Sequence, residues 1–452
     1  MVSEQRTFTT GSEPEQASRI SRRGFLGRAA ALGLGTTALA GILSSCGTTA
    51  FGAGKTHITY WHLLGGGDGE RMLEMVQQFQ HNHPEVDLEA VTLSWGTPYY
   101  TKLAMAAAGG RPPDVSILHM SRLPMYAGSG LLEPFDTSAL SNNGITQDNF
   151  VDPVWQKAHY NGKLYAVPLD THPLVMYYST DVCQKAGLLD SNGKLLEFKG
   201  EDDVLNAFSE AKKASGGLGL AMGVGDPSTC WRVFCALYAQ LNGQYFSADG
   251  TQLTFEDDKA EQVLAYISKL AKEVGSTNID YPGAVALFSG GKAGFHWNGE
   301  WEVTTFQAQK MKFDMTLFPN VFGGQQTWAD SHSLVLPRQG TVDPERRAMS
   351  IKFVSELLKS SYIWAQGGHI PTYLPVATSS EYKQLSPQSH YAAEASNVVY
   401  DPPVWFAGAA SELENQAGAA FQSVIMQQKT PKQGIQQFRA AMLKQLQTPK
   451  PF

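Results

Sequence analysis

The chain of 452 residues has few cysteines, only four. Three of them, Cys183, Cys230 and Cys235, lie in the body of the chain, and no two cysteines have the C-x-x-C spacing of a zinc site or a redox motif. Cys230 and Cys235 fall in the apolar segment TCWRVFCAL, which predicts two small core residues of a helix. A bridge between those two residues stays open.

Runs of basic residues are also missing, and the formal net charge is −7. An acidic chain without a Lys/Arg-rich run argues against nucleic acid and against an anionic membrane surface as partners. Hydrophobic residues make up 42% and charged residues 17% of the chain, which is typical of a globular soluble protein. At this length two lobes, each with its own core, are expected.

The chain lacks the motifs of several enzyme classes. It contains no G-x-S-x-G nucleophile elbow, no phosphate loop and no H-E-x-x-H zinc motif. Its eleven histidines show no ligand pairing either, and we expect residues such as His62, His81 and His369 to be solvated. The sequence therefore predicts no metal and no cofactor.

Residues 1–46 are predicted to be an export signal. Ser21–Leu26 reads SRRGFL, which matches the twin-arginine pattern, and a short Gly/Ala-rich apolar stretch follows from Ala29 to Leu43. The stretch ends in LSSC, which resembles a lipobox with Cys46 as the lipidated residue. A lipid on Cys46 would anchor the protein to the outer face of the cell membrane, with 47–55 as a flexible tether.

The segment His159–Val182 organises the rest of the chain. Asn161-Gly162 predicts a tight hairpin turn, and two apolar runs follow at Leu164–Leu169 and Leu174–Tyr178. Between these runs lies a polar insert, Asp170-Thr171-His172-Pro173, so a plain central strand is not expected. One interpretation is a crossing between two α/β lobes, with the insert facing a cleft. The other is an edge strand that is broken by an ordinary turn.

Other segments alternate between strand and helix patterns, which predicts an α/β fold. Strands are expected at His57–Leu63 and Val115–His119, with a glycine-rich turn at 65–69 after the first. Apolar residues recur at helical spacing in three segments, namely Glu70–His81, Asp202–Ser215 and Lys259–Val274.

Several phrases, taken in order, resemble the extracellular solute-binding proteins of carbohydrate ABC importers, the group that includes the maltose-binding protein. The first is the crossing itself, N-G-K-x-Y-x-x-P followed by an insert and Tyr-Tyr. The others are the G-x-x-P-D phrase at 110–114, the phrase YSTDVCQKAGL at 178–188, the block from Phe288 to Trp301, and G-x-x-P at 368–371. The resemblance runs from about Thr56 to the C-terminus.

This resemblance implies a two-lobed, type II periplasmic-binding-protein-like fold with a hinged cleft. Each lobe would be built from two separate segments of the chain. The expected segments are 55–169 plus 333–375 for lobe 1, and 173–330 plus 376–446 for lobe 2.

The candidate site combines aromatic faces with polar side chains, because a sugar ring offers both C–H patches and hydroxyls. Trp301 and Trp405 are the expected platforms, since both follow turns that the family directs at its cleft. Nine polar residues are expected to contact ligand: Asp68, His119, Arg122, Asp170, His172, Asp226, Asn298, Glu300 and His369.

The function that follows is capture of a sugar or oligosaccharide by closure of the two lobes, and delivery to the transmembrane subunits of an ABC permease. We expect a monomer without enzymatic activity. One alternative is a secreted glycoside hydrolase that uses Asp170 and Glu300 as its two carboxylates. The other is a binding protein for a glycerol-phosphate-type ligand.

Overall fold

The computed structural model describes residues 54–451. The twin-arginine segment, the lipobox at Cys46 and almost all of the predicted tether therefore lie outside the described residues. Within 54–451, no helix combines the length and the apolar character that a membrane span requires.

The first sheet has the strand order β2-β1-β3-β13-β4, and β7 pairs with β13 at its side. β1 is parallel to β2 and β3, whereas β13 is antiparallel to β3, β4 and β7. The bounds are β1 Thr56–His62, β2 Val86–Thr92, β3 Val115–His119, β4 Leu132–Glu133, β7 Ala166–Pro168 and β13 His332–Pro337. The strands predicted at 57–63 and 115–119 are confirmed.

Seven α-helices lie between β1 and β7 or directly after β13. They are α3 Gly66–Asn82, α4 Thr97–Ala108, α5 Leu123–Gly128, α6 Thr137–Asn142, α7 Asp152–Lys157, α14 Pro344–Lys359 and α15 Ser361–Gln366. α3 buries Met72, Met75, Val76 and Phe79, the spacing that predicted it. The predicted glycine-rich turn is wrong, because α3 already begins at Gly66 and takes these glycines into its first turn.

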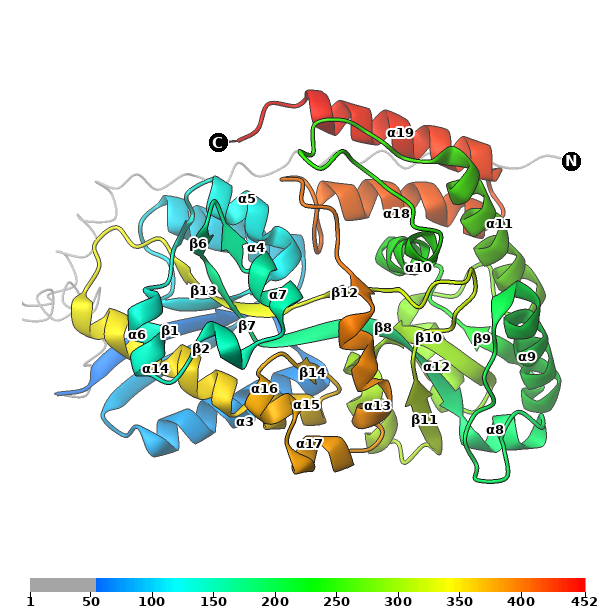
Figure 1. Cartoon of the computed structure of the whole chain (residues 1–452), viewed down its shortest axis with the longest axis horizontal. Coiled ribbons are helices and arrows are strands. Elements are labelled where there is room, and N and C mark those ends of the chain that lie inside the picture. Colours follow the sequence, from blue (N-terminus) through cyan, green and yellow to red (C-terminus); the bar gives the residue numbers. More distant parts are fainter. Residues whose placement is uncertain (1–53, 452) are drawn as a thin grey trace, which may run out of the picture. The chain divides into compact units, whose positions relative to one another are not determined.

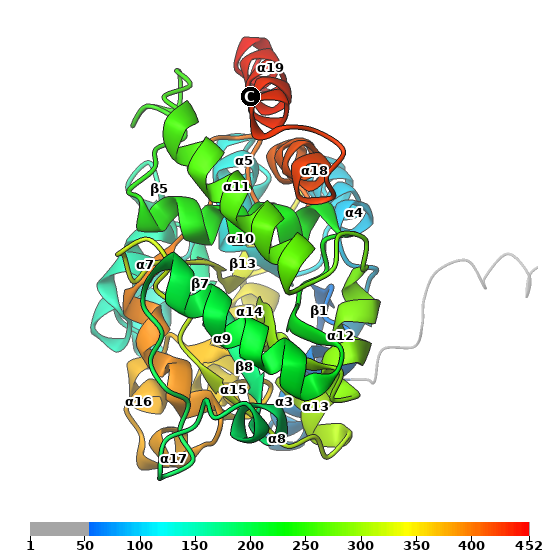
Figure 2. The ribbon, with the colours of Figure 1, turned by 90° about the vertical axis from the view of Figure 1, so that its right-hand side faces the viewer.

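The second sheet has the order β15-β12-β8-β10-β9, with β11 and β14 also paired to β8. The bounds are β8 Asp170–Ser179, β9 Leu218–Ala221, β10 Ala293–Gly299, β11 Phe313–Thr316, β12 Thr327–Asp330, β14 Ile370–Pro371 and β15 Val398–Val399. Ten helices complete this part of the chain: α8 Thr180–Lys185, α9 Gly200–Ser215, α10 Pro227–Gln240, α11 Asp257–Glu273, α12 Tyr281–Ser289, α13 Val303–Ala308, α16 Leu374–Ala377, α17 Ser380–Gln384, α18 Glu412–Ile425 and α19 Pro431–Gln447. α9 packs over β9 and β10 (Figure 1), and α18 packs along α19 and against α10 (Figure 2).

Each sheet has its own core. One cluster of buried side chains extends from Ile58 to Leu169 and continues with residues 334–373, while another takes most of its members from 174–328 and 404–442. A smaller third cluster packs around Tyr177 and Phe306. Both sheets are therefore assembled from segments far apart in the chain. The lobe boundaries predicted from the sequence stay predictions.

The two sheets meet where the chain passes from one to the other (Figure 1). The predicted turn is confirmed: Asn161 and Gly162 have φ of 48° and 75° and join β5 His159–Tyr160 to β6 Lys163–Leu164. The chain then crosses at Leu169, between β7 and β8, and returns at Ser331, between β12 and β13.

The prediction that a polar insert interrupts the crossing strand is wrong. Residues 170–173 form the start of β8, a continuous strand in the middle of its sheet. Their backbone pairs with β14 and β12, and the strand changes partners to β10 and β11 after Pro173. Pro173 is tolerated in a central strand because it lies at this change of partners.

The cysteines of the described chain are free. Cys183, Cys230 and Cys235 are all buried, and none is bridged. Burial raises the pKa of the Cys183 thiol to about 12, so this thiol stays protonated at neutral pH. Cys230 and Cys235 lie in α10, as their apolar surroundings predicted.

Candidate ligand-binding site

The main cavity of the described residues has a volume of about 580 Å³ and lies where the ends of several strands converge. The first sheet contributes residues that follow β1 and β2 and the last residue of β3, a usual ligand position in open α/β sheets. The lining residues are Leu63, Leu64, Gly65, Asp68, Thr92, Leu93, Ser94, Trp95, His119, His172, Asp226, Ser228, Arg232, Tyr281, Trp301, Trp328 and His332. The cavity is thus lined from both sheets.

Indole rings form part of the wall. The Trp301 indole Nε1 donates to the Tyr281 hydroxyl over 2.8 Å, and that hydroxyl in turn donates to Glu302 over 2.6 Å. Trp328 is buried to 2% exposure and fixed by a 3.0 Å bond from its Nε1 to Asp401, whereas Trp95 is 49% exposed. The hydrogen-bonded indoles of Trp301 and Trp328 and the exposed indole of Trp95 can stack on the apolar faces of a ligand's rings.

Arg232 is the cation of this wall. Its guanidinium lies 4.9 Å from the ring centre of Trp328 and 5.6 Å from that of Trp301, and it forms a 3.0 Å ion pair with Glu414. Burial alone would lower the pKa of Arg232, but the nearby carboxylates, Glu414 first, raise it above its usual value. The group stays charged and presents its remaining N–H donors beside the indoles.

Three imidazoles form the floor of the cavity. The ring centres of His172 and His332 are 4.2 Å apart, and His119 lies 4.6 Å from His332 and 5.4 Å from His172. Nδ1 of His172 and of His332 donates to the two oxygens of Asp170 over 3.0 and 2.7 Å. The carboxylate thereby fixes which ring nitrogen carries the proton and leaves both Nε2 atoms as acceptors.

Asp170 is the buried centre of this network. It also accepts from the backbone N–H of His332 and from the Trp364 indole, each over 2.7 Å. Burial would raise the pKa of Asp170, but the adjacent His332 and His172 outweigh it and lower that pKa well below its usual value. Burial lowers the pKa of His172 to about 3, so its imidazole is neutral at pH 7.

His369 connects three carboxylates behind the cavity. Its Nε2 bonds Asp68 at 2.9 Å, while its Nδ1 lies 3.0 Å from Glu300 and 3.2 Å from Asp170. Burial would lower the pKa of His369, but Asp68 and the other two carboxylates raise it well above the usual value. Burial raises the pKa of Glu300 to about 7. The prediction of a solvated His369 is wrong, because this ring is fully buried. His62, at 5% exposure, is buried as well.

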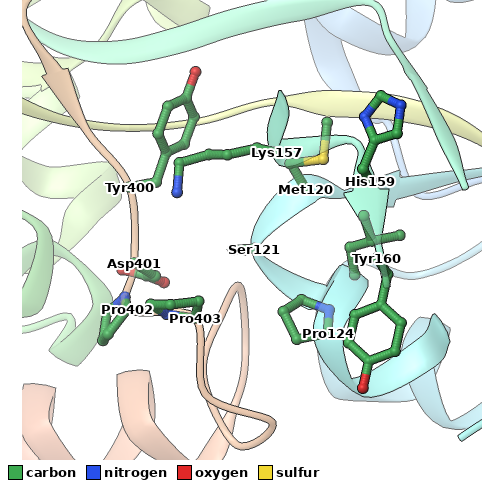
Figure 3. A pocket seen from close by; sticks show the side chains of 11 residues that line it. Met120, Ser121, Pro124, Lys157, His159, Tyr160, Tyr400, Asp401, Pro402 and Pro403 are labelled. Carbon is green, nitrogen blue, oxygen red and sulfur yellow. The ribbon is translucent and has the colours of Figure 1, made fainter. Parts of the chain in front are cut away.

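A second cavity of about 210 Å³ lies beside the first. Tyr400 and Asp401 line one side, and Pro124 and Tyr160 line the other, while Lys157 extends toward Tyr400 (Figure 3). The Asp401 carboxylate accepts from both Trp231 and Trp328 over 3.0 Å, and burial raises its pKa to about 7. Because Trp328 lines the main cavity, this bond joins the walls of the two cavities.

Among residues 54–451, two groups of side chains have the spacing of metal ligands. In each group one ligand atom per residue lies within 4.8 Å of every other: Asp170, His172, His332 and His369 in the first, and His119, His172 and Asp330 in the second. In the first group, Nδ1 of each of the three histidines faces the Asp170 carboxylate, at 3.0, 2.7 and 3.2 Å for His172, His332 and His369.

Comparison with known families gives a match over residues 74–390 to the family described as bacterial extracellular solute-binding protein. The match covers more than half of the chain. The chain is a bacterial extracellular solute-binding protein.

Similar proteins agree with this assignment. The arabinooligosaccharide-binding protein of Bacillus subtilis is 24% identical, over 85% of this chain and 91% of the relative. The sn-glycerol-3-phosphate-binding periplasmic protein of Salmonella typhimurium is 22% identical, over 87% and 93%. The GacH receptor of Streptomyces glaucescens, solved unliganded and with acarbose, is 17% identical over 88% and 100%, with a TM-score of 0.74. The solute-binding protein therefore has the two-lobed, periplasmic-binding-protein-like α/β fold that the resemblance implied.

The structure separates the residues that the sequence proposed for the site into three groups. Trp301, Asp68, His119, His172 and Asp226 line the main cavity. Asp170, Asn298, Glu300 and His369 are buried behind its wall and hold it: Asn298, for example, donates to the Tyr281 hydroxyl over 2.9 Å.

The other two lie elsewhere. Arg122 sits 4.7 Å over the ring of Tyr100, and Trp405 packs against the core of the second sheet and beside Phe406. Neither residue lines the main cavity.

The sequence reasoning missed Arg232 and Tyr281. Arg232 is the only charged residue within α10, and most of that helix is buried. A lone charge in an apolar helix needs a partner or a polar cavity, which was the available signal. Tyr281 follows the Asp280 cap at the start of α12, a position without any pattern of its own.

Proposed function

We propose that this solute-binding protein captures a carbohydrate in its main cavity and delivers it to the permease of an ABC importer. The observation that carries the proposal is the wall of the cavity itself, where fixed indoles lie beside acceptor imidazoles and one cation. Pyranose rings need apolar faces for their C–H patches and polar partners for their hydroxyls. The relative named for arabinooligosaccharide and the GacH receptor solved with acarbose support this class of ligand.

Closure of the two lobes is the proposed mechanism. The cavity is lined from both sheets, and the chain crosses between them at Leu169 and Ser331. A ligand that contacts both sides favours the closed arrangement, which also excludes water from its hydrogen bonds. The anchor at Cys46 and the position outside the cell membrane belong to the same proposal, and mass spectrometry of the N-terminal peptide tests the lipid.

The positions of the two proposed carboxylates do not support the alternative of a glycoside hydrolase. Asp170 and Glu300 are both fully buried, and both face Nδ1 of His369 rather than open space. A glycosidase needs its two carboxylates on either side of the scissile bond. A phosphorylated polyol stays in the ligand panel, since Arg232 lines the cavity and one relative is named for sn-glycerol 3-phosphate.

A thermal-shift screen of the purified protein tests the proposal with mono-, di- and trisaccharides, polyols and sn-glycerol 3-phosphate. A ligand at one hundred times its dissociation constant stabilises the folded state by about 2.7 kcal/mol, which gives a clear rise in melting temperature. The ligand should be recovered unchanged. A panel without any shift would contradict the carbohydrate assignment, and a cleaved ligand would point to an enzyme.

Trp301 and Trp405 provide a matched pair of variants. Both are partly buried tryptophans, but only Trp301 lines the main cavity. Trp301→Ala should weaken binding of the ligand found in the screen by about tenfold or more, because a stacking aromatic contributes roughly 0.5–1.5 kcal/mol beyond its buried area. Trp405→Ala should leave affinity within a factor of about two. Equal losses in calorimetric titrations of the two variants would contradict the site.

A further inference from the structure

His119 and His172 line the main cavity, and the buried carboxylate of Asp330 lies close to both imidazoles. One ligand atom each from His119, His172 and Asp330 lies within 4.8 Å of the other two. The three residues come from different segments, namely the end of β3, the start of β8 and the end of β12. All three are buried, at 5%, 3% and 0% exposure.

Both imidazoles are held through Nδ1. His172 Nδ1 donates to Asp170 at 3.0 Å, and His119 Nδ1 lies 2.7 Å from the Tyr100 hydroxyl. Among residues 54–451, no hydrogen bond reaches Nε2 of either ring. A histidine that binds metal through one nitrogen characteristically donates the other N–H to a carboxylate or a similar acceptor, which fixes its tautomer and orientation. Asp170 and Tyr100 occupy those supporting positions.

Asp330 is a carboxylate that forms no ion pair in the described chain, although its charge acts on Lys157. It accepts from the backbone N–H of Ser121 at 3.0 Å and of Ser331 at 2.8 Å, and from the Ser121 hydroxyl. Buried charges in proteins are paired or coordinate metals. Among the described residues, Asp330 thus has the hydrogen bonds of a charged carboxylate but no ion-paired cation.

We propose that His119 Nε2, His172 Nε2 and Asp330 bind a divalent transition metal, with Zn²⁺ as the best fit, and leave its fourth position open to the cavity. Two imidazoles and one carboxylate are a usual ligand set for zinc with an open position. The charge of Arg232, the cation on the neighbouring wall, is offset by its ion pair with Glu414. A ligand hydroxyl or water would complete the coordination.

This site does not depend on the proposed carbohydrate, so the metal is tested alone. The full chain is stripped with a chelator, dialysed against Co²⁺ or Zn²⁺, and analysed for bound metal. We expect one Co²⁺ per chain with the intense visible absorption of a low-coordinate site, and displacement of Co²⁺ by Zn²⁺. A stripped chain that retains no metal after dialysis would overturn the proposal.

Variants separate this site from other histidines. Asp330→Asn keeps the size of the side chain and an acceptor for Ser121, and should weaken Zn²⁺ binding by about a hundredfold, since even supporting residues of a metal site are worth 10- to 100-fold. His119→Gln should do the same. His390→Ala, which removes an exposed histidine paired with Asp314 at 2.7 Å, should leave Zn²⁺ affinity unchanged. Equal affinity in Asp330→Asn and His390→Ala would overturn the proposal.

If these variants fail to fold, crystallography of the unaltered protein still tests the metal site. Anomalous diffraction from Zn²⁺-soaked crystals of the unaltered protein should place one peak between His119, His172 and Asp330. A peak only at surface histidines such as His81 or His390 would overturn it.

Discussion

At the scale of single residues, Asp170 determines how the floor of the cavity is built. Its two oxygens accept from His172, His332 and Trp364, so one carboxylate fixes the orientation of side chains from three segments. Asp170 itself is fully buried and does not contact the cavity. Its role is to position the residues that do.

The first residue-scale prediction concerns this carboxylate. Asp170→Asn places an amide N–H₂ among groups that all donate, and removes one of the three carboxylates that face His369. We expect a loss of about 3–5 kcal/mol in the free energy of unfolding, as for other broken buried pairs. Asp257→Asn is the control, because its pair with Arg439 is exposed and worth about 1 kcal/mol or less. Urea unfolding of both variants measures the difference, and a similar small loss in each would refute this role.

The second concerns Glu394, which is fully buried and accepts a 2.5 Å hydrogen bond from the backbone N–H of Phe318. Burial raises its pKa from 4.5 to about 8. The folded state therefore holds a proton that the unfolded state releases, so this residue makes stability fall as pH rises from 4.5 to 8, by at most about 1.4 kcal/mol per pH unit.

Glu394→Gln keeps the acceptor but cannot ionise. Its stability should lose this part of the pH dependence and exceed that of the wild type at pH 8. Chemical denaturation across that range checks the result. Parallel curves for the variant and the wild type would show that Glu394 is ionised in both states.

Sequence reasoning reached some of these residues and not others. Trp301 could be placed because a recognisable phrase surrounds it, and it does line the cavity. Trp405 was placed by the same kind of argument but packs against a core. The hydrogen bonds of Asp170 join residues that are far apart in the chain, such as His332 and Trp364. A local sequence pattern does not indicate which distant residues will become partners.

At the scale of elements, periodicity predicted the helices well and the central strand poorly. α11 runs from Asp257 to Glu273 and buries Ala260, Val263, Leu264, Ile267 and Leu270, the face that its spacing indicated. The sequence predicted an interruption in β8 because the first residues of this strand are polar. Every residue of β8 is nevertheless buried. Polar side chains that satisfy one another behave as core residues, and alternation of hydrophobicity does not reveal them.

A glycine pair tests how tightly the elements pack. At Gly219, in β9, an added Cβ would overlap the carbonyl oxygen of Phe208 in α9. Gly219→Ala should therefore lower the free energy of unfolding by about 1–3 kcal/mol, the usual cost of overpacking. At Gly65, φ is −125° and an added Cβ meets nothing within 4 Å, so Gly65→Ala should be nearly neutral. Thermal unfolding compares the two variants, and equal melting temperatures would contradict this packing.

At the scale of the whole described chain, the site belongs to both sheets, and this leads to a prediction about motion. Binding at a cavity lined from both sides should favour the closed arrangement, so the radius of gyration in solution should fall when the ligand is added. Small-angle X-ray scattering measures this change. Trp301→Ala should respond only at higher ligand concentration, and a radius that stays constant at saturation would rule out closure.

The return of the chain from the second sheet to the first at β13 also affects the order in which the protein can fold during synthesis. β13 lies between β3 and β4 in the first sheet, and its residue His332 pairs with His119. The ribosome must therefore synthesise five of the seven strands of the second sheet before β13, which completes the first sheet. Until then the edges of β3 and β4 that β13 will cover are unpaired, and unpaired strand edges readily pair with other chains.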